Sequence, residues 1–184
     1  SKSQGERIVH DPRLTWNTLE IIESNGGLPI QSRPGHAFIK QTMRENDAVY
    51  GGETSAHHYF REFSYADSGM IPWLIIAELM CQRKLPLSAL VDERMTLFPT
   101  SGEINRKVDD SAEVLARVEK SYIHHALSIH HIDGLSMEFS DWRFNVRASN
   151  TEPLLRVNVE TRSNERLMLT QTKQLLEVIG GEPG

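Results

Sequence analysis

The sequence has very little cysteine, since Cys81 is the single one among its 184 residues. No disulfide can form within the chain, and zinc sites built from cysteines are excluded. Long hydrophobic runs are also missing, and residues 1–6 (SKSQGE) have no apolar core of the kind that a signal peptide needs. From these absences we expect a cytoplasmic protein that does not associate with membranes.

The sequence also lacks an excess of basic residues. Its formal net charge is -5 at pH 7. Proteins that bind nucleic acids or anionic membranes in general depend on a basic surface, so neither partner is expected. Apolar residues make up 39% of the chain, which is enough to form hydrophobic cores, and the length suits two small domains.

The first half of the chain alternates short apolar segments with helical patterns, which is typical of an α/β domain. Thr15 is placed to cap the first helix. The most apolar helical pattern contains Trp73 and is expected to lie in a core. We expect strands at 7–12, 28–32 and 48–50, and helices at 16–24, 37–46, 68–83 and 86–97.

The second half has a different pattern. Residues 98–103 (FPTSGE) interrupt the periodicity and predict a linker. Asp133-Gly134 predicts a tight hairpin. After the linker we expect a strand at 104–108, a helix from Ser111, alternating strands at 127–132, 135–139, 142–146 and 154–159, and a helix at 165–179. This order indicates an α+β domain with an antiparallel sheet, and it divides the chain into domains at 1–98 and 99–184.

Residues 51–60 (GGETSAHHYF) form the most polar and aromatic loop of the first half. Its glycines would let the backbone approach a ligand closely. A carboxylate and a hydroxyl can share hydrogen bonds with a diol, and its histidines titrate near neutral pH. The loop follows a predicted strand, at the strand end where α/β sheets usually place ligands. The composition favours a sugar as the ligand.

Residues 147–153 (RASNTEP) form the corresponding loop of the second half. A guanidinium fork can bind two oxygens of a phosphate, while hydroxyl, amide and backbone N–H groups bind the others. A solvated hairpin turn with a local side-chain hydrogen bond has the same composition. The loop by itself leaves these two interpretations open.

Together the two loops resemble the α-D-phosphohexomutases. Residues 52–57 (GETSAH) match the sugar-binding motif G-E-x-S-G/A-H of that family, and residues 147–151 (RASNT) match its phosphate-binding motif R-x-S-N-T. Residues 67–73 (DSGMIPW) and 141–144 (DWRF) are similar to bacterial phosphomannomutases. The resemblance covers nearly the whole chain. It implies a mixed α/β three-layer first domain and a second domain with an antiparallel sheet flanked by helices, as in TATA-binding-protein-like folds.

The resemblance also implies roles for particular residues. Glu53 and Ser55 would contact the O3 and O4 hydroxyls of the sugar, which mannose and glucose share. His57 would also touch the substrate, and Arg13 would face the site. The residues that would hold the non-reacting phosphate are Arg147, Ser149, Asn150 and Thr151.

Two histidines match family positions near the reacting end. His36 and His57 could assist proton transfer or balance charge there. The chain departs from the family at two places, because a lysine is common at the position of Arg13 and a glycine where Ala56 stands.

Two motifs of the family are missing from this sequence. The family has four domains, with a phosphorylated serine loop in the first and a magnesium loop, D-G-D-x-D-R, in the second. The chain therefore resembles domains 3 and 4 alone, with no metal ligand of its own, and its partners would be the missing N-terminal domains 1 and 2. The intact enzyme is an intramolecular phosphotransferase that interconverts hexose 6-phosphate and hexose 1-phosphate through hexose 1,6-bisphosphate, with Mg2+ as cofactor. We expect the fragment alone to be inactive.

Two other functions fit parts of the sequence. The chain could be a stand-alone module that binds a sugar phosphate, such as mannose or glucose phosphate, without a catalytic partner. The histidine pairs at 57–58, 124–125 and 130–131 could suggest a metal-dependent hydrolase. Neighbouring histidines on a helix or strand point in different directions, which disfavours the hydrolase.

Overall fold

The computed structural model describes residues 5–149 and 152–184. The chain folds into two compact units, Ser1–Arg94 and Met95–Gly184. Among the described residues, no helix is both long enough and apolar enough to cross a membrane. The division into domains at residue 98 stays a prediction.

The first unit is built on a mixed sheet with the strand order β2-β1-β3-β4-β5. β1, β2 and β3 run parallel to one another, whereas β4 and β5 are antiparallel to their neighbours. The 3-10 turn Arg61–Phe63 connects β4 to β5. The strands span Arg7–His10 (β1), Leu28–Gln31 (β2), Tyr50–Gly52 (β3), His58–Phe60 (β4) and Ala66–Asp67 (β5).

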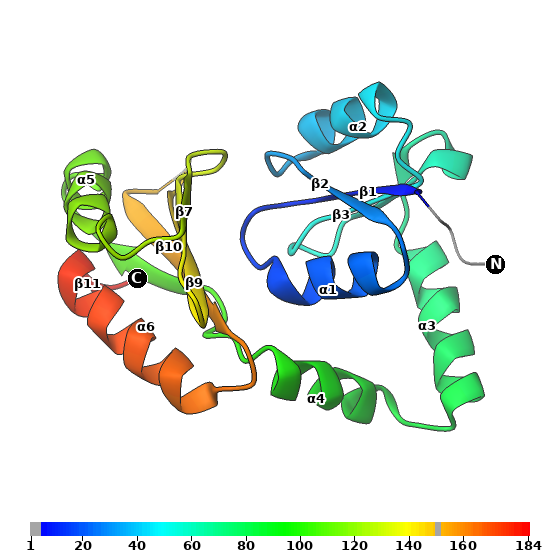
Figure 1. Ribbon diagram of the computed structural model, residues 1–184. Coiled ribbons are helices and arrows are strands. Elements are labelled where there is room, and N and C mark those ends of the chain that lie inside the picture. The colour runs from blue at the N-terminus through cyan, green and yellow to red at the C-terminus, as the bar shows by residue number, and fades with distance from the viewer. Residues whose placement is uncertain (1–4, 150–151) are drawn as a thin grey trace. The chain divides into compact units, whose positions relative to one another are not determined.

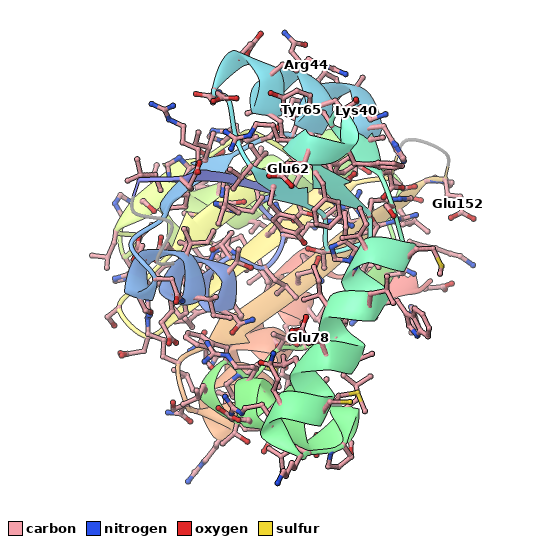
Figure 2. All side chains as sticks on the ribbon, turned by 90° about the vertical axis from the view of Figure 1, so that its right-hand side faces the viewer. Lys40, Arg44, Glu62, Tyr65, Glu78 and Glu152 are labelled. Atoms are coloured by element: carbon pink, nitrogen blue, oxygen red, sulfur yellow. The ribbon has the colours of Figure 1, made fainter. Side chains whose placement is uncertain are left out.

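Two helices, α1 (Trp16–Ser24) and α2 (His36–Glu45), cover opposite faces of this sheet (Figure 1). The core on the α2 side consists of Val9, Ile39, Met43, Ala48 and Tyr59. The guanidinium of Arg44 lies 5.3 Å from the centre of the Tyr65 ring, and Figure 2 labels both side chains. The helix-sheet-helix arrangement confirms the mixed α/β fold expected of the first half.

Several local predictions for this unit need correction. The bounds of α1 agree with the sequence pattern, but the Thr15 side chain makes no capping hydrogen bond. The strand expected at 48–50 begins later, at Tyr50, and residues 51–60 form the β3-β4 hairpin. Pairing between these strands outweighs the turn propensity of the glycines.

Gly51 lies where a helix packs closely on the sheet. A Cβ atom at this position would lie 2.7 Å from Sδ of Met43 and 2.9 Å from Cγ2 of Ile39. Glycine is therefore required here because α2 packs closely against β3. This packing gives Gly51 a role in the core, and the predicted approach of its backbone to a ligand stays a prediction.

The helix α3 (Met70–Arg83) contradicts the expectation of a core helix. None of its residues is buried, and Trp73 is 60% exposed. The next helix, α4 (Leu87–Leu97), also has no buried residue. Periodicity identifies a helix, but burial depends on another element covering it, which the sequence pattern does not report.

The second unit contains an antiparallel sheet with the strand order β11-β6-β10-β9-β8-β7. Every neighbouring pair in it is antiparallel. The edge strand β11 was not predicted. The strands span Ile104–Lys107 (β6), Ser128–His130 (β7), Leu135–Glu138 (β8), Trp142–Ala148 (β9), Leu154–Thr161 (β10) and Glu182–Pro183 (β11).

Two amphipathic helices, α5 (Ser111–Tyr122) and α6 (Glu165–Ile179), pack on this sheet (Figure 1). Asp110 caps α5, because its side chain accepts hydrogen bonds from the N–H groups of Ala112 and Glu113. The Trp142 ring stacks on Phe139 at 4.3 Å. These features confirm an antiparallel sheet flanked by helices, as the sequence predicts.

The hairpin between β7 and β8 is longer than the predicted two-residue turn. The strands pair only as far as His130 and Ser136, so Asp133 lies within a wider loop. Gly134 has a φ of +70°, and a Cβ there would lie 2.3 Å from the carbonyl oxygen of Val146. Close contact with β9 therefore explains this glycine.

Candidate functional site

The parallel strands of the first unit bring three loops to one edge of its sheet. Because β1, β2 and β3 run in the same direction, their carboxyl ends lie together. The loop after β1 carries Asp11 and Arg13, the loop after β2 carries Gly35, and the loop after β3 carries Glu53. This is the edge at which α/β sheets generally bind ligands.

Glu53 is buried, with only 8% of its surface exposed, and its carboxylate is held in a defined orientation. Its Oε2 accepts a hydrogen bond from the Gly35 N–H at 2.8 Å, and its Oε1 accepts one from the Tyr59 hydroxyl at 2.5 Å. Burial raises the pKa of Tyr59, and the Glu53 carboxylate adds to this shift, so the phenol keeps its proton and donates. Each carboxylate oxygen has a further lone pair for a ligand hydroxyl.

Asp11 joins the first loop to the third. Its carboxylate accepts from Nε and Nη2 of Arg13, at 3.0 and 2.5 Å, and from the backbone N–H and hydroxyl of Thr54, at 2.7 and 2.9 Å. Burial would raise the pKa of Asp11, but Arg13 and the Thr54 N–H outweigh it and hold the pKa below its ordinary value. The network positions Arg13, which is itself 7% exposed, through Asp11.

His36 and His57, which are far apart in the sequence, lie side by side. Their ring centres are 4.5 Å apart in an edge-to-face arrangement. Nδ1 of His57 lies 2.7 Å from Oδ2 of Asp67, and Oδ1 of Asp67 accepts from the His58 N–H at 2.9 Å. Burial would raise the pKa of Asp67, but the His58 N–H and the two histidine rings hold it below its ordinary value.

His58 has a different partner from its neighbour. Its Nδ1 lies 2.5 Å from the Tyr50 hydroxyl. Burial lowers the pKa of His58, and burial also raises the pKa of Tyr50 to about 12. A neutral imidazole that accepts from a protonated phenol accounts for this contact, so His58 serves the hairpin.

The tip of the β3-β4 hairpin carries the predicted sugar contact Ser55. Ser55 is exposed, as are both of its neighbours, Thr54 and Ala56. Ala56 has a φ of +65°, a left-handed conformation that glycine adopts without strain. The tip can therefore present the Ser55 hydroxyl to a ligand beside Glu53, two residues away.

In the second unit, Arg147 lies near the end of β9, opposite Arg156 of β10. Glu103 pairs with both guanidiniums, at 3.1 Å from Arg147 and 3.5 Å from Arg156. Nε of Arg147 also lies 3.8 Å from Oδ2 of Asp133, and the buried Nε atoms of both arginines make no hydrogen bond with the residues that the structure describes. Buried donors of this kind are rarely left unsatisfied, so the pair is suited to an anion.

The remaining predicted phosphate ligands follow Arg147 directly. The Ser149 N–H donates to the Leu154 carbonyl at 2.9 Å, and the residue is partly buried. Asn150 and Thr151 lie outside the described residues. Their predicted role in phosphate binding stays a prediction.

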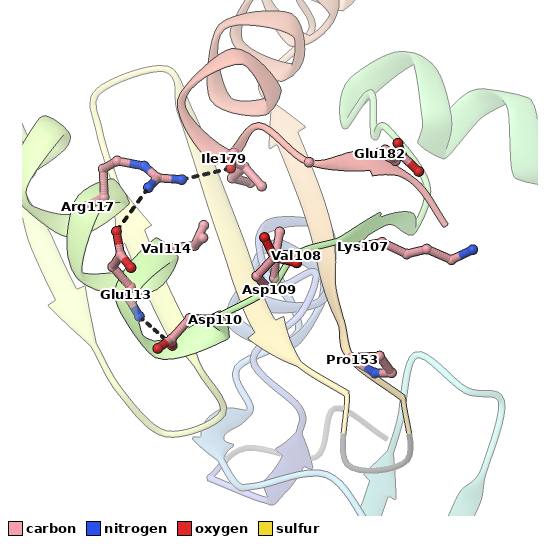
Figure 3. Close-up of a pocket in the computed structure, with 11 residues that line it drawn as sticks. Lys107, Val108, Asp109, Asp110, Glu113, Val114, Arg117, Pro153, Ile179 and Glu182 are labelled. Atoms are coloured by element: carbon pink, nitrogen blue, oxygen red, sulfur yellow. Dashed lines mark hydrogen bonds and ion pairs between the residues drawn. The ribbon is translucent and has the colours of Figure 1, made fainter.

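A cavity of about 720 Å3 lies elsewhere in the second unit (Figure 3). None of the predicted site residues lines it. Asp110 caps α5, while Arg117 pairs with Glu113 at 3.7 Å and donates to the Ile179 carbonyl at 3.0 Å. Its acidic lining residues outnumber its basic ones, Lys107 and Arg117 against Asp109, Asp110, Glu113 and Glu182. Such a lining repels phosphate.

Four residues of these arrangements were not predicted from the sequence. Asp11 follows β1 directly, so the rule that ligands bind at the carboxyl ends of parallel strands could have identified it. Arg156 stands opposite Arg147, which only the strand register reveals. Tyr59 and Asp67 lie in the segments 51–60 and 67–73, which the sequence singles out, but their partners depend on how the hairpin folds.

Models of protein families match both halves of the chain. Residues 1–98 match the alpha/beta/alpha domain III of phosphoglucomutase/phosphomannomutase, and residues 103–174 match the C-terminal domain of the same family. The chain therefore belongs to the phosphoglucomutase/phosphomannomutase family.

Relatives and solved structures agree with this assignment. A phosphomannomutase from Escherichia coli is 54% identical over 178 residues, covering 97% of the chain and 39% of the relative. A protein named phosphohexose mutases, from Xanthomonas campestris pv. campestris, is 56% identical over 181 residues, covering 98% of the chain and 40% of the relative. The chain thus spans about two fifths of the length of these relatives.

A crystal structure of a phosphoglucomutase/phosphomannomutase family protein from Burkholderia thailandensis has the same fold. It superposes with a TM-score of 0.76 at 24% identity, covering 98% of this chain and 39% of that one. A phosphomannomutase structure from Thermus thermophilus, described as putative, gives a TM-score of 0.64 at 19% identity, with coverages of 96% and 37%. At these identities the likeness concerns the fold alone.

Proposed function

We propose that this chain is the substrate-recognition half of a phosphohexomutase, which interconverts hexose 6-phosphate and hexose 1-phosphate through hexose 1,6-bisphosphate. The observation that carries the proposal is the orientation of Glu53, whose two oxygens accept from the Gly35 N–H and the Tyr59 hydroxyl within the family's sugar-binding motif. The activity itself needs the part of the relatives that this chain does not span.

Sugar recognition follows from the geometry of the Glu53 loop. A carboxylate held by two internal donors cannot rotate freely, so its remaining lone pairs have fixed directions. Two neighbouring hydroxyls, O3 and O4 of a hexose, would donate to them, with Ser55 as an additional partner. Mannose and glucose differ at C2, so this loop would accept both.

Phosphate recognition is assigned to the loop that begins at Arg147. Arg147 and Arg156 offer buried Nε donors on neighbouring strands, and a dianionic phosphate would compete for their guanidiniums with Glu103 and, at Arg147, with Asp133. Ser149, Asn150 and Thr151 would complete the set. The charge of the pair favours the non-reacting phosphate group over a neutral sugar.

His36 and His57 would lie at the reacting end of the substrate. Asp67 orients His57, because its contact with Nδ1 leaves Nε2 as the nitrogen directed away from the carboxylate. In this role His57 would exchange a proton with a substrate hydroxyl, while His36 would balance the phosphate charge. Arg13, held by Asp11, would contribute positive charge.

Magnesium is the cofactor that the family implies, and its chemistry in the intact enzyme would be to neutralise phosphate charge during transfer. The described residues do not fit it. His36, His57 and Asp67 form a cluster in which candidate ligand atoms lie close together, and two of the three are imidazoles. Mg2+ prefers oxygen ligands in octahedral geometry, so its site is assigned to the part of the relatives that this chain does not span.

A chimera tests the proposed function. The C-terminal 39% of the E. coli phosphomannomutase that this chain matches would be replaced by the chain itself. We expect the chimera to convert mannose 6-phosphate in a coupled assay and the isolated chain to be inactive. A correctly folded chimera without activity, together with saturable sugar-phosphate binding by the isolated chain, would support the stand-alone binding module instead.

Arg147→Ala should weaken binding of a hexose phosphate by about 2 kcal/mol, or roughly thirtyfold, because a charge-assisted bidentate contact is lost. The measurement is a titration of the chain with mannose 6-phosphate followed by NMR. Arg166→Ala is the matched control, since it removes the same charge from an exposed position of α6 in the same unit. Equal affinities of the two variants would reject the phosphate assignment.

A further inference from the structure

We propose that His36, His57 and Asp67 form a binding site for a late first-row transition-metal ion, of which Zn2+ is the natural example. The inference starts from the positions of these three side chains. It does not depend on the proposed function.

The three residues come from separate segments that the fold brings together. His36 is the first residue of α2, His57 precedes β4, and Asp67 ends β5. One candidate ligand atom from each lies within 4.8 Å of the other two. Zinc bonds of about 2.1 Å in tetrahedral geometry separate two ligand atoms by about 3.4 Å. Nδ1 of His57 and Oδ2 of Asp67, at 2.7 Å, would therefore move apart by roughly 0.7 Å, and the other separations would close by at most about 1.4 Å.

The ligands are largely positioned before a metal arrives. The backbone N–H of His58 holds Oδ1 of Asp67 at 2.9 Å, which leaves Oδ2 directed at Nδ1 of His57. The His36 ring packs edge to face against Tyr59 at 5.4 Å and against His57 at 4.5 Å. Supporting contacts of this kind increase the affinity of a metal site because they reduce the entropy lost on binding.

The set of donors selects the metal. Two imidazoles and one carboxylate are the ligands of many catalytic zinc sites, in which a fourth position stays open for water or a substrate oxygen. Mg2+ binds nitrogen ligands weakly. Among the divalent first-row transition metals, the affinity for nitrogen ligands rises from Mn2+ to Cu2+ and remains high for Zn2+. The side chains of His57 and Asp67 are 42% and 28% exposed, so an ion in solution can reach them.

A consequence follows if the proposed function also holds. Zinc held between Oδ2 of Asp67 and Nδ1 of His57 would replace the contact by which Asp67 orients His57, and it would also engage His36, which that function uses for charge balance. The open fourth position would attract a phosphate oxygen of the substrate. Zinc would then inhibit the intact enzyme while magnesium would not act at this position.

The test is equilibrium binding of Zn2+ to the 184-residue chain, in competition with a chromophoric chelator at pH 7.5. We expect one high-affinity ion per chain. His36→Ala, His57→Ala and Asp67→Asn should each weaken binding at least tenfold. Asparagine keeps an oxygen that can accept from the His58 N–H, so Asp67→Asn preserves the fold, which backbone NMR spectra of every variant would verify.

His131→Ala is the matched control. Nε2 of His131 lies 3.2 Å from Glu119, so this histidine also has a carboxylate neighbour, but it belongs to no three-residue cluster among the described residues. Its substitution should leave zinc affinity unchanged.

NMR signals of the His36 and His57 rings should shift on adding Zn2+, and Co2+ should give the absorption of a four-coordinate site. Absence of zinc binding, or equal affinity in the wild type and all three site variants, would overturn the proposal. Because no activity is measured, failure of the proposed function would leave these results unchanged.

Discussion

Asp11→Ala should lower the free energy of unfolding of the first unit by about 3–5 kcal/mol, since it removes the carboxylate from a buried ion pair with Arg13. Asp11 is 2% exposed and accepts hydrogen bonds from both Arg13 and Thr54. Removing it also separates the loop after β1 from the β3-β4 hairpin. The substitution should therefore both destabilise the first unit and disorder the β3-β4 hairpin that carries Glu53.

The same carboxylate predicts a pH dependence. The pKa of Asp11 is lower in the folded chain than its ordinary value of 3.8, so folding favours the ionised form. Its contribution to stability is fully present above that ordinary value and is lost as the pH falls through the folded pKa. The wild type should therefore lose more stability than Asp11→Ala when the pH is lowered through this range.

Hydrogen exchange of the backbone amides, measured by mass spectrometry on peptides from each unit, reports the stability of the two units separately. Exchange should accelerate within residues 5–94 of Asp11→Ala and stay unchanged in the second unit. Asp47→Asn is the control, because Asp47 pairs with Arg61 at 3.1 Å on the surface, where its side chain is 71% exposed. An exposed ion pair contributes little to stability. Equal exchange in the two variants would refute the structural role of Asp11.

Glu53→Gln should reduce kcat/KM of the chimera by about 100-fold, or about 3 kcal/mol, because two hydrogen bonds from sugar hydroxyls to a charged acceptor are lost. The substitution preserves the shape of the side chain. An amide NH2 group cannot accept from the Gly35 N–H or the Tyr59 hydroxyl, so the carboxamide also turns away from its defined orientation. The loss should be the same for mannose and glucose substrates.

Glu62→Gln provides the matched control for this prediction. Glu62 is exposed on the 3-10 turn of the same unit, and Figure 2 labels it. The Glu62→Gln substitution removes the same charge without changing the Glu53 loop, so kcat/KM should remain near that of the unmodified chimera. Loss of activity in Glu62→Gln comparable to that in Glu53→Gln would show that net charge matters instead of the position of the carboxylate.

Much of the fold was predictable because its signals are local. The bounds of α1 and α6 agree with the apolar periodicity and flanking residues of 16–24 and 165–179. Alternating residues likewise identified the strands of the antiparallel sheet. Burial of α3 was predicted wrongly, since Trp73 is exposed and a helical pattern carries no information about its neighbours.

The sequence by itself determined the family, through two short motifs at 52–57 and 147–151, and with it the residues expected to bind a sugar phosphate. Only the tertiary structure decided which of these side chains lie close to one another in space. The contact of His36 with His57 and Asp67, and the link from Asp11 to Thr54, join segments far apart in the chain. Such contacts follow from strand order and register, which local propensities do not encode.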